Sequence, residues 1–586
     1  MKKLYTVAIT AILFSKTLFP NIALAEYSLF DTSYLHEIRI SSTNPDFWTQ
    51  LDDDYNAWLT GAIADIPYLQ ATVEIDGTSM DNVGVRQKGF SSNFLIDTTK
   101  KPLKLNFGKF SIGGEREFDG VRKLNLMNGL GDPVIIKDKL AYNMFRMHGI
   151  PGPRVSHAKI YVNDTFWGVY ALIEQIDKRY LKRNFANNDG NLWKNKDSSN
   201  LSWQGNDPAN YTFELQTNET ANDWSKFIGF VDFINNSSDA DFANQLADIF
   251  VLDEYLRILA IDILINNWDS YLDHGRNWYL YHEPRKNKIH WVPWDYNFAF
   301  DRNSAGSTDI ALVQDTFPLD DKVLVRRVFA VPEFKERIFN YMCEILEVNF
   351  TSDRIHPILD SQLTLVINDW GASNDFLTTS TLNDFIDGVT WFGIFGRVFQ
   401  SMKHFVTDRS NVIVNELLSE GHTCTSLATS VNPQDVVINE FMASNGNGSP
   451  WPDQDGDFDD WIELYNNTSS PISLENYFLS NTDTFLHKWE LPADAVIPAN
   501  GYLIIWADKD PHQIGLHAKF SLPKSGGSIY LSYLDDTLID SISFGAQETS
   551  QSLSRIPNGT GDFVIAQVTF NAENTGGDLI FTSGFE

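Results

Sequence analysis

Cysteine is almost absent from this sequence, in which Cys343 and Cys424 are the only two among 586 residues. Two cysteines exclude a disulfide framework and a zinc site built from cysteine ligands alone. In an oxidising compartment the pair could form one disulfide that ties a linker back to the first predicted domain. The sequence leaves this pairing open, because a disulfide needs the two Cα atoms within about 7 Å of each other.

Positive charge is also in short supply, with 45 Lys and Arg against 77 Asp and Glu and a formal net charge of -32. Such a chain repels phosphate backbones, which argues against general binding to nucleic acid or to an anionic membrane surface. An acidic balance also has a simpler explanation, which is solubility outside the cytoplasm.

Long apolar runs are missing after the N-terminus. Residues 1–25 combine Lys2 and Lys3, a short apolar core and the small-residue sequence Ala23-Leu24-Ala25, a pattern typical of a secretory signal peptide cleaved before Glu26. The apolar core is too short to span a bilayer comfortably, so an uncleaved anchor is the second choice. We expect a secreted, periplasmic or cell-surface protein with no integral membrane segment after cleavage.

Material for packed interiors is plentiful, since 43% of the residues are hydrophobic and 13% are aromatic. This composition excludes wholesale disorder. A chain of 586 residues is too long for one core and predicts two or three domains.

The stretch 266–300 holds the strongest pattern of chemically active residues. An apolar segment at 248–265, predicted as a buried helix, leads into it, and strands at 277–282 and 288–293 form a predicted hairpin within it. In chain order the stretch carries Asp269, Asp273, Asn277 and Asp295. A carboxylate with a nearby Asn, a hairpin and a second carboxylate is a layout of phosphoryl-transfer enzymes. Asp after a strand is also common in Asx-turns, so the pattern needs support from the rest of the chain.

Cationic residues that could meet a phosphate precede this stretch. Arg86 and Lys88 lie in a polar loop with Gly and Ser, and the alternating strand 103–107 places Lys104 on the face opposite its leucines. A loop of this kind can cover phosphates and a strand lysine can reach them, although an ordinary basic hairpin has the same pattern.

One helix and two strands are predicted between these regions. The helix spans 133–148, with Asp132 as its N-cap and Gly149 at its C-terminal cap. Its polar face carries Lys137, Asp138 and Lys139. The strands span 157–162 and 167–173, and the second leads into Glu174.

This order of loop, strand lysine, helix, two strands, buried helix, acidic loop, hairpin and aspartate is that of protein-kinase-like folds. Five motifs follow one another along the chain: GVRQKGFSS, KKPLKLNF, FDGVRKLNLMNGLGDPVIIKDKLAYNMFRMHGIPGPRVSHAKIYVNDTFWGVYALIEQIDKRYLKRNF, NNWDSYLDHGRNWYLY and IHWVPWDYNFAF. Together they resemble the spore-coat protein H (CotH) kinase family, over residues 29–417. The resemblance implies an atypical protein kinase that binds ATP with Mg²⁺ or Mn²⁺ and phosphorylates Ser or Thr of proteins.

The resemblance also implies roles for particular residues in nucleotide binding. Arg86 and Lys88 would line the loop that covers the phosphates. Lys104 would pair with the phosphates, with Lys101 as the alternative. Glu174, in GVYALIEQID, matches a characteristic acidic position that is either in the nucleotide pocket or structural.

For the chemical step the resemblance implies Asp269 as acid and base, Asn277 as a metal ligand, and Asp295 in PWDYN as the main magnesium ligand. Asn277 lies eight residues after Asp269 and four after Asp273, whereas the kinase pattern has about five, so both aspartates are candidate catalytic residues. Asp295 is followed by Tyr-Asn rather than Phe-Gly, so the usual activation switch is not carried over. His274 could assist, but such a loop histidine is more often a hydrogen-bonded surface residue.

A polar segment at 421–435 is predicted to be a linker, and the rest of the chain is rich in short strands. These strands are predicted at 436–438, 461–465, 502–506, 528–533 and 538–544, a spacing typical of an immunoglobulin-like β-sandwich. The segments VVINEFMASN, DDWIELYNNTSSPISLENYFLSN, IPANGYLIIWAD and SLSRIPNGTGDF resemble the lamin-tail domain over 436–573. That resemblance implies an accessory or binding module and does not name its ligand.

Alternating aspartates lie between the first two of these strands: Asp453, Asp455, Asp457 and Asp459. Oxygen ligands in such a loop suit Ca²⁺. The loop lacks the later bidentate Glu of an EF-hand, so a solvated acidic loop is the alternative.

The sequence therefore predicts an α+β protein, with a kinase-like domain followed by a β-sandwich. The predicted divisions are a signal peptide at 1–25, the kinase-like domain at 26–420, a linker at 421–435, the sandwich at 436–573 and a tail at 574–586. The expected activity is transfer of the ATP γ-phosphoryl group to a protein substrate whose identity, like the oligomeric state, the sequence does not give. A non-catalytic adhesion or scaffold protein is the second hypothesis, because ATP is scarce outside the cytoplasm. A metal-dependent phosphodiesterase is the third, and it would not need the full kinase-like order.

Overall fold

The computed structural model describes residues 29–575, apart from 95–99, 186, 301–321, 371–378, 389, 393–397, 425–431, 433, 447–448, 454–455, 493–494, 511–512, 514 and 535. The predicted signal peptide at 1–25, part of the predicted linker and most of the predicted tail lie outside the described residues. Within the described ranges, no helix combines the length and the apolar composition needed to cross a membrane.

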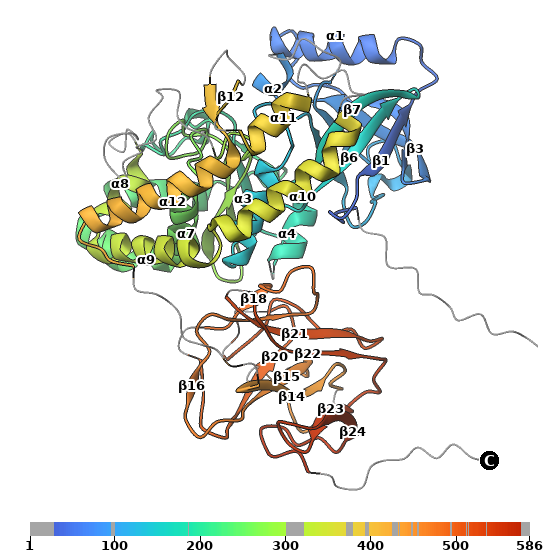
Figure 1. Ribbon diagram of the computed structural model, residues 1–586. Coiled ribbons are helices and arrows are strands. Elements are labelled where there is room, and N and C mark those ends of the chain that lie inside the picture. The colour runs from blue at the N-terminus through green and yellow to red at the C-terminus, as the bar shows by residue number, and fades with distance from the viewer. Residues whose placement is uncertain are drawn as a thin grey trace, which may run out of the picture.

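A closed β-barrel forms the first part of the chain (Figure 1). Around the barrel the strands are β1 (His36–Ser41), β2 (Leu69–Ile75), β3 (Thr78–Gln87), β4 (Leu103–Asn106), β5 (Lys123–Met127), β7 (Thr165–Glu174) and β6 (Val155–Val162). Neighbouring strands are antiparallel, except that β1 and β6 pair in parallel and close the barrel. Alternate residues fill the interior, as Leu103 and Leu105 do on either side of Lys104. Helix α1 (Phe47–Leu59) packs against β3.

Helices pack against a second sheet, which is antiparallel. Its strand order is β11 (Lys288–Pro293), β10 (Trp278–Glu283), β8 (Leu192–Asn195) and β9 (Phe213–Leu215). The helices of at least seven residues here are α3 (Lys137–Met147), α4 (Lys178–Asn184), α5 (Ser225–Asn236), α6 (Asp239–Ile249), α7 (Leu252–Leu264), α8 (Val323–Ala330), α9 (Pro332–Val348), α10 (Ser352–Trp370), α11 (Thr379–Ile386) and α12 (Met402–Ser419). The short elements are α2 (Ser91–Phe94), η1 (Ile112–Gly114), η2 (Pro208–Asn210), β12 (Thr390–Phe392) and β13 (Val398–Gln400). One large apolar core joins this sheet to α3 and the surrounding helices.

The two cysteines form a disulfide. Cys343 of α9 is bonded to Cys424, which follows α12, across 81 residues of sequence. The pairing that the sequence left open is therefore present, and it fastens the start of the predicted linker to the first domain.

Helix α3 begins four residues later than predicted. Ile135 has a φ of +52°, which is outside the helical region, so the chain makes a turn before the helix starts. The predicted N-cap is therefore wrong, because the N-cap residue is Ile136, although Asp132 Oδ2 accepts the N–H of Lys137 at 2.7 Å. At the other end Gly149, with a φ of +71°, ends the helix as predicted.

The single helix predicted at 248–265 is wrong, because the chain there belongs to two helices, α6 and α7. Phe250 is extended between them and forms a bridge to Ile289 of β11. The N–H of Val251 then donates to the Ile289 oxygen at 2.9 Å. This pairing with a distant strand interrupts the helix, and apolar periodicity alone does not reveal it.

The C-terminal domain is a β-sandwich, as predicted, and a strand lies at each of the five predicted positions. One sheet has the order β20 (Tyr502–Trp506), β15 (Trp461–Asn466), β14 (Val436–Met442), β23 (Ser552–Ile556) and β24 (Asp562–Ala566). The other has the order β18 (Trp489–Glu490), β17 (Tyr477–Ser480), β21 (Gly527–Tyr533) and β22 (Leu538–Phe544). The short strands β16 (Ile472–Ser473) and β19 (Val496–Ile497) pair with each other. An apolar core of its own lies inside this domain, and the chain as a whole is α+β with an immunoglobulin-like sandwich, as predicted.

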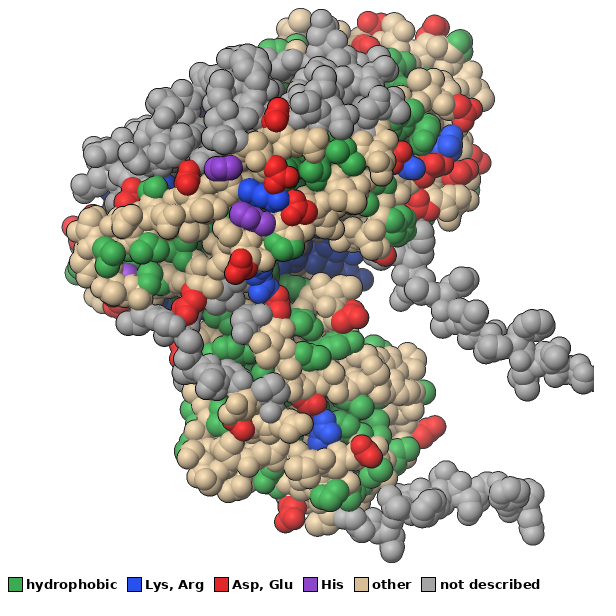
Figure 2. All heavy atoms as spheres, in the orientation of Figure 1, with side chains coloured by type: hydrophobic (Ala, Val, Ile, Leu, Met, Phe, Trp, Pro, Cys, Tyr) green, Lys and Arg blue, Asp and Glu red, His purple; other side chains and the backbone are tan. Residues whose placement is uncertain are grey.

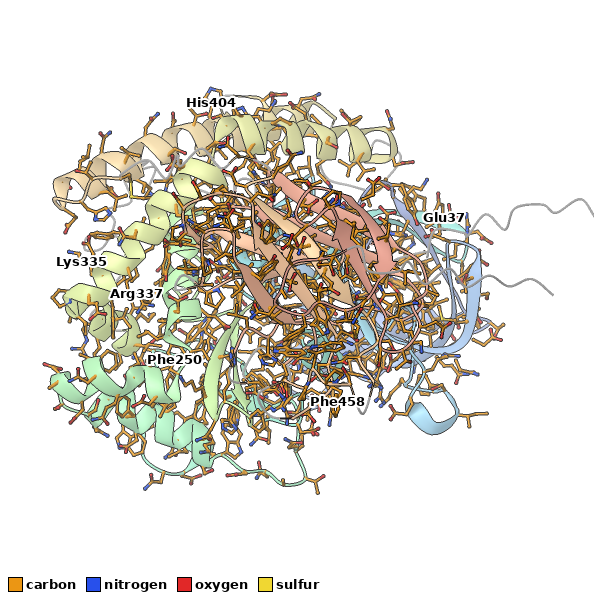
Figure 3. All side chains as sticks on the ribbon, turned by 90° about the horizontal axis from the view of Figure 1, so that it is seen from below. Glu37, Phe250, Lys335, Arg337, His404 and Phe458 are labelled. Atoms are coloured by element: carbon orange, nitrogen blue, oxygen red, sulfur yellow. A yellow bond between two sulfur atoms is a disulfide. The ribbon has the colours of Figure 1, made fainter. Side chains whose placement is uncertain are left out.

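The sandwich lies against one side of the first domain, at the side of β18 (Figure 1). Figure 3 views the molecule from the side of the sandwich, whose strands cross in front of the first domain. Helix α9, with Lys335 and Arg337, and helix α12, with His404, lie at the outer edge of this view. The sandwich therefore faces the middle of the first domain rather than these outer helices.

Candidate functional site

Asp269 and Asn277 lie on the loop that joins α7 to β10, and the structure brings them into direct contact. The side-chain amide of Asn277 donates to the main-chain oxygen and to Oδ2 of Asp269, at 2.9 Å each. Asn277 has a φ of +65°, which Asn tolerates, and the strand therefore starts one residue later than predicted. Burial, and then the negative charge of Asp295, raise the pKa of Asp269 to about 6. A fixed carboxylate with a pKa near neutrality is suited to general-base chemistry.

Asp295 lies two residues after the end of β11, and its charge acts on Asp269. Its N–H donates to the Tyr142 hydroxyl of α3 at 2.9 Å, and its φ is +61°. Its Oδ1 is buried and has no hydrogen-bond partner among the described residues. Burial raises the pKa of Asp295, while the positive charges of Lys88 and Lys194 oppose that rise. A buried carboxylate oxygen without a donor is the arrangement expected of a cation ligand.

Asp138, in the first turn of α3, adds another carboxylate to this group. A polar helix face usually meets solvent, but Asp138 is only 4% exposed and its neighbour Lys137 is fully buried. Asp138 Oδ1 accepts the N–H of Tyr296 at 2.8 Å, so this face of α3 meets the chain after β11 instead. Burial, and then the charge of Asp295, raise the pKa of Asp138 well above its usual range. Asp138 and Asp295 therefore repel each other across a partly enclosed space.

Two lysines approach Asp295 from different sheets. Lys88 directly follows β3 in the barrel, and its Nζ lies 3.1 Å from the sulfur of Met127, which is a weak acceptor. Burial lowers the pKa of Lys88 to about 8, and Asp295 opposes this fall. Lys194 lies on β8 of the second sheet, where burial lowers its pKa while Glu214 and Asp295 oppose the fall.

Lys104 on β4 joins this group from the barrel wall. Its Nζ donates to Oε1 of Gln175 at 2.6 Å. Burial lowers the pKa of Lys104 well below its usual range, and the like charges of Lys88 and Arg86 lower it further. Arg86 pairs with Lys104 in the strand register, and its Nη1 donates to the Ile66 oxygen at 3.1 Å. Cations that repel one another in a partly buried space favour an anionic ligand.

Glu174 lies in a separate ion-pair cluster. Its Oε1 accepts from Arg154 at 3.0 Å and its Oε2 from Arg183 at 2.5 Å. Burial acts to raise the pKa of Glu174, but the two arginines outweigh it and lower the pKa to about 2. Adjacent residues of an extended chain point to opposite faces, and it is the next residue, Gln175, that contacts Lys104.

Asp273 and Lys101 have partners of their own. Asp273 Oδ2 lies 3.5 Å from Nδ1 of His274, and this contact raises the pKa of His274. His274 Nδ1 also lies 2.8 Å from the Trp268 oxygen. Lys101 Nζ donates to the main-chain oxygen of Asn93 in α2, at 2.9 Å. Lys104 shares contacts and charges with the rest of the site through Gln175, Lys88 and Arg86.

A pocket opens beside Asp138. Its lining consists of Ser92, Met127, Asn128, Gly129, Leu130, Asp132, Ile135, Asp138, Ala171 and Asn297. Asn297 Nδ2 donates to the Leu130 oxygen at 2.9 Å, which holds the chain after β11 against the loop before α3. The pocket therefore lies between the barrel, α3 and the segment that carries Asp295.

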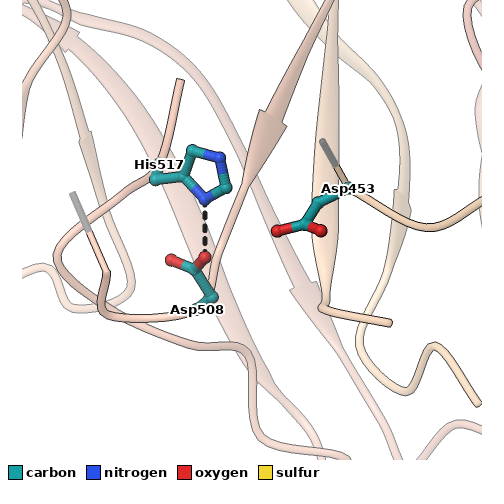
Figure 4. A group of neighbouring side chains, drawn as sticks. All are labelled: Asp453, Asp508 and His517. Atoms are coloured by element: carbon teal, nitrogen blue, oxygen red, sulfur yellow. Dashed lines mark hydrogen bonds and ion pairs between the residues drawn. The ribbon is translucent and has the colours of Figure 1, made fainter. Parts of the chain in front are cut away.

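The acidic loop of the sandwich brings several ligand atoms together. Of the four aspartates predicted to bind Ca²⁺, the structure describes Asp453, Asp457 and Asp459, while Asp455 lies outside the described residues. Those three each place a carboxylate oxygen within 4.8 Å of the others. Asp453 makes a second group of this kind with Asp508 and His517, whose Nδ1 lies 2.6 Å from Asp508 Oδ2 (Figure 4). Sequence reasoning missed Asp508 and His517, because they are remote from the loop in the chain.

Three residues of the first-domain site were also missed by motif reasoning: Asp138, Gln175 and Lys194. Asp138 had no local signal, because it lies between Lys137 and Lys139 on a helix face that the sequence predicts to be polar. Lys194 and Gln175 had none either, because their role depends on a neighbouring sheet and on strand direction.

Comparison with known proteins identifies similar sequences over both domains. A family model described as CotH kinase protein matches residues 85–413, which is more than half of the chain, and one described as Lamin Tail Domain matches residues 429–546. The chain is 24% identical over 280 residues to Inner spore coat protein H of Bacillus subtilis, covering 46% of this chain and 73% of that protein. It is 20% identical over 245 residues to Spore coat protein homolog 1 of Rhizopus delemar, covering 39% of each. The candidate site residues of the first domain, from Arg86 to Asp295, all lie within the first match.

Proposed function

Because the chain belongs to the CotH kinase protein family, we propose that it is an exported protein kinase that transfers the γ-phosphoryl group of ATP to Ser or Thr hydroxyls of proteins. The observation that carries this proposal is the meeting of carboxylates and lysines from five separate elements. Asp138, Asp269 and Asp295 come from α3, the α7–β10 loop and the end of β11. The lysines come from the barrel and from β8. Phosphoryl transfer needs this combination, since it proceeds by positioning and by neutralising phosphate charge.

The carboxylates fit a divalent cation. Oδ1 of Asp295 is buried without a hydrogen-bond donor among the described residues, and the charge of Asp295 raises the pKa of Asp138. A cation would remove both penalties. We assign Asp295 and Asn277 as the residues that would hold Mg²⁺ or Mn²⁺, and the bound ion would neutralise charge on the nucleotide phosphates.

The lysines and Arg86 provide the complementary charge for the nucleotide. Arg86 lies on β3, Lys88 just after β3 and Lys104 on β4, so they would contact the phosphates from the barrel side. Lys194 would contact them from the β8 side. Placement on two sheets encloses the phosphates and favours the polyanion over a single carboxylate.

Asp269 is the better placed of the two candidate catalytic aspartates. It receives two hydrogen bonds from Asn277, and its pKa is raised to about 6, whereas Asp273 contacts His274 instead. In the proposed reaction the acceptor hydroxyl oxygen bonds to the γ-phosphorus and the bond from that phosphorus to the bridging oxygen of ADP breaks. Asp269 takes the hydroxyl proton, and ADP leaves with its new charge facing the lysines.

Export is supported by two independent features. The predicted signal peptide at 1–25 is the first, and the disulfide between Cys343 and Cys424 is the second, because disulfides persist mainly in oxidising compartments. The two relatives are named as spore coat proteins, which is in keeping with a surface role.

Incubation of the purified mature chain with γ-labelled ATP and Mg²⁺ or Mn²⁺ tests the proposal. Label should appear on the chain itself or on a generic protein acceptor, and it should be lost in Asp295→Asn and Lys104→Met. Two matched changes at exposed positions, Asp562→Asn and Lys182→Met, should leave the transfer unchanged.

A lack of label transfer would refute the proposal if nucleotide binding is also absent. If no label transfers and calorimetry finds no metal-dependent nucleotide binding, the kinase proposal fails. The adhesion or scaffold hypothesis then takes its place, with the sandwich as the binding part.

A further inference from the structure

Ion pairs join the sandwich to the first domain, and their charges are arranged in one direction. In the described part of the chain the pairs that cross between the domains are Arg257 with Glu490, Arg285 with Asp510, and Arg354 with Asp536. Each cation belongs to the first domain and each carboxylate to the sandwich. Figure 2 shows Lys and Arg side chains in the recess between the two domains. At these three contacts the two domains are therefore complementary in charge.

The contact between Arg257 and Glu490 consists of two hydrogen bonds. Arg257, on α7, donates to both carboxylate oxygens of Glu490 on β18, at 2.9 and 3.3 Å. The two side chains are only 13% and 23% exposed. Burial acts to lower the pKa of Arg257, but Glu490 and then Asp253 raise it above its usual value. A bidentate, largely buried pair of this kind is stronger and more specific than an exposed one.

A further contact lies at the C-terminal end of α3. Lys519 of the sandwich donates to the main-chain oxygen of Gly149 at 3.3 Å. Glu490 lies beside the same glycine, since a Cβ added there would be 3.8 Å from Glu490 Oε2. The sandwich thus covers the end of α3 as well as α7.

The elements that the sandwich contacts include the three that carry the site carboxylates. Helix α3 has Asp138 in its first turn and Gly149 just beyond its last. Helix α7 bears Arg257 and leads into the loop of Asp269. The turn with Arg285 starts β11, which leads to Asp295. Inside the first domain α7 and β11 are also joined, by Glu254 and His290 at 2.8 Å.

Repulsion between like charges at the site opposes the close packing of the elements that carry them. Asp138 and Asp295 carry like charges in a partly buried space, and Lys88, Lys104 and Arg86 repel one another beside them. Without a ligand the repulsion within each set of like charges works against the packing of these elements, so contacts outside the site help to hold the elements in place. The sandwich contacts lie at the opposite ends of the same elements, where they add no charge to the site.

We propose that the sandwich braces the phosphotransferase site, with Glu490 as the principal positioning residue, by docking on the far ends of α3, α7 and the β10–β11 hairpin. This inference rests on the proposed kinase function for its effect on catalysis, but not for the docking itself. Helices and paired strands move as rigid units, so a shift at the docked end displaces the carboxylate at the other. A displacement of about 1 Å can lower the rate of an enzyme about a hundredfold.

The test uses the full mature chain and reverses one charge. Glu490→Arg should repel Arg257, speed amide hydrogen exchange at 137–142, 266–277 and 293–297, and lower kcat for phosphoryl transfer at least about tenfold, with KM for ATP changed less than about threefold. Glu490→Asp keeps the charge and should retain most of both properties. Asp562→Arg, on β24 at the far end of the sandwich in Figure 1, is the matched control.

A second variant tests whether any effect of Glu490→Arg comes from lost docking rather than from misfolding of the sandwich. Arg285→Glu perturbs the contact with Asp510 from the first-domain side and should have the same effect on exchange at 293–297. Unchanged exchange at the site in both variants overturns the brace, whatever the activity. Faster exchange with an unchanged kcat also overturns it, because the docking would then be irrelevant to the reaction. If the wild type transfers no phosphate, the kinase proposal fails, and the exchange data alone decide whether the sandwich holds the carboxylates in place.

Discussion

Replacing Glu174 by Gln should destabilise the first domain by about 3 kcal/mol and leave nucleotide binding unchanged. The Glu174 side chain is fully buried, at 1% exposure, and accepts hydrogen bonds from Arg154 and Arg183. Burial disfavours its charge, but the two arginines lower its pKa from 4.5 to about 2. That fall of about 2.5 pH units corresponds to about 3 kcal/mol in favour of the charged carboxylate in the folded state. Loss of one partner from a buried ion pair typically costs about 3–5 kcal/mol, so the two estimates agree.

The effect depends on pH in a defined direction. The pKa of Glu174 is lowered in the folded state, so its stabilisation is fully present above the unfolded pKa of 4.5 and is lost as the pH falls toward about 2. Gln at this position has no such group. The difference in unfolding free energy between wild type and variant should therefore be about 3 kcal/mol at pH 7 and should shrink steadily below pH 4.5.

Amide hydrogen exchange of β5 and β7 measures this difference in the first domain separately from the sandwich. Asp189→Asn is the matched control, because Asp189 pairs with Lys178 at 3.2 Å while both side chains are mostly exposed. The control should change stability by less than about 0.5 kcal/mol. If Glu174→Gln instead keeps its stability and loses ATP binding, the carboxylate belongs to the nucleotide pocket and its structural role is refuted.

Other predictions concern the metal ligand Asp295, the phosphate-site residue Lys194, the disulfide and the acidic loop of the sandwich. Asp295→Asn should lower phosphoryl transfer at least about a hundredfold without loss of stability, and near-normal transfer would exclude Asp295 as the main metal ligand. Lys194→Met should raise KM for ATP about tenfold in steady-state assays, and an unchanged KM would remove Lys194 from the phosphate site. Serine at both Cys343 and Cys424 should cost about 2–4 kcal/mol in urea unfolding, since the bond closes a loop of 81 residues, and equal stability of both forms would contradict this. Calorimetry should detect Ca²⁺ binding that Asp508→Asn weakens at least about tenfold, and no heat from the wild type would leave the acidic loop as solvated surface.

Sequence reasoning succeeded where the chemistry is local. Asp269 and Asn277 were predicted to belong to one candidate site, and the structure joins them by two hydrogen bonds, while their roles in catalysis stay predictions. Gly149 was expected to end a helix and does so with a positive φ. The strands of the sandwich were also predictable, because alternation and turn residues act over a few positions.

Long-range contacts account for what the sequence did not reveal. The helix predicted at 248–265 is interrupted at Phe250 only because that residue pairs with β11. Asp138 lies on a face that would normally be solvated, and it becomes part of the site only when the chain after β11 packs onto it. Lys194 is placed beside Asp295 by the pairing of β8 with β10. No local property of these residues distinguishes them from surface charges.

The contacts between the domains are the long-range contacts that are hardest to predict from the sequence. They also affect how the kinase proposal must be tested. Arg257 and Glu490 are each an unremarkable surface charge in the sequence, and they lie within two separate family matches, 85–413 and 429–546. Only the folded structure shows their role, because together they fasten the sandwich to α7, which leads into the loop of Asp269. A first domain expressed without the sandwich would keep every proposed phosphate and metal residue but would lose the contacts at the far ends of their supporting elements. Inactivity of such a fragment would therefore not count against the kinase function, whereas inactivity of the full mature chain would.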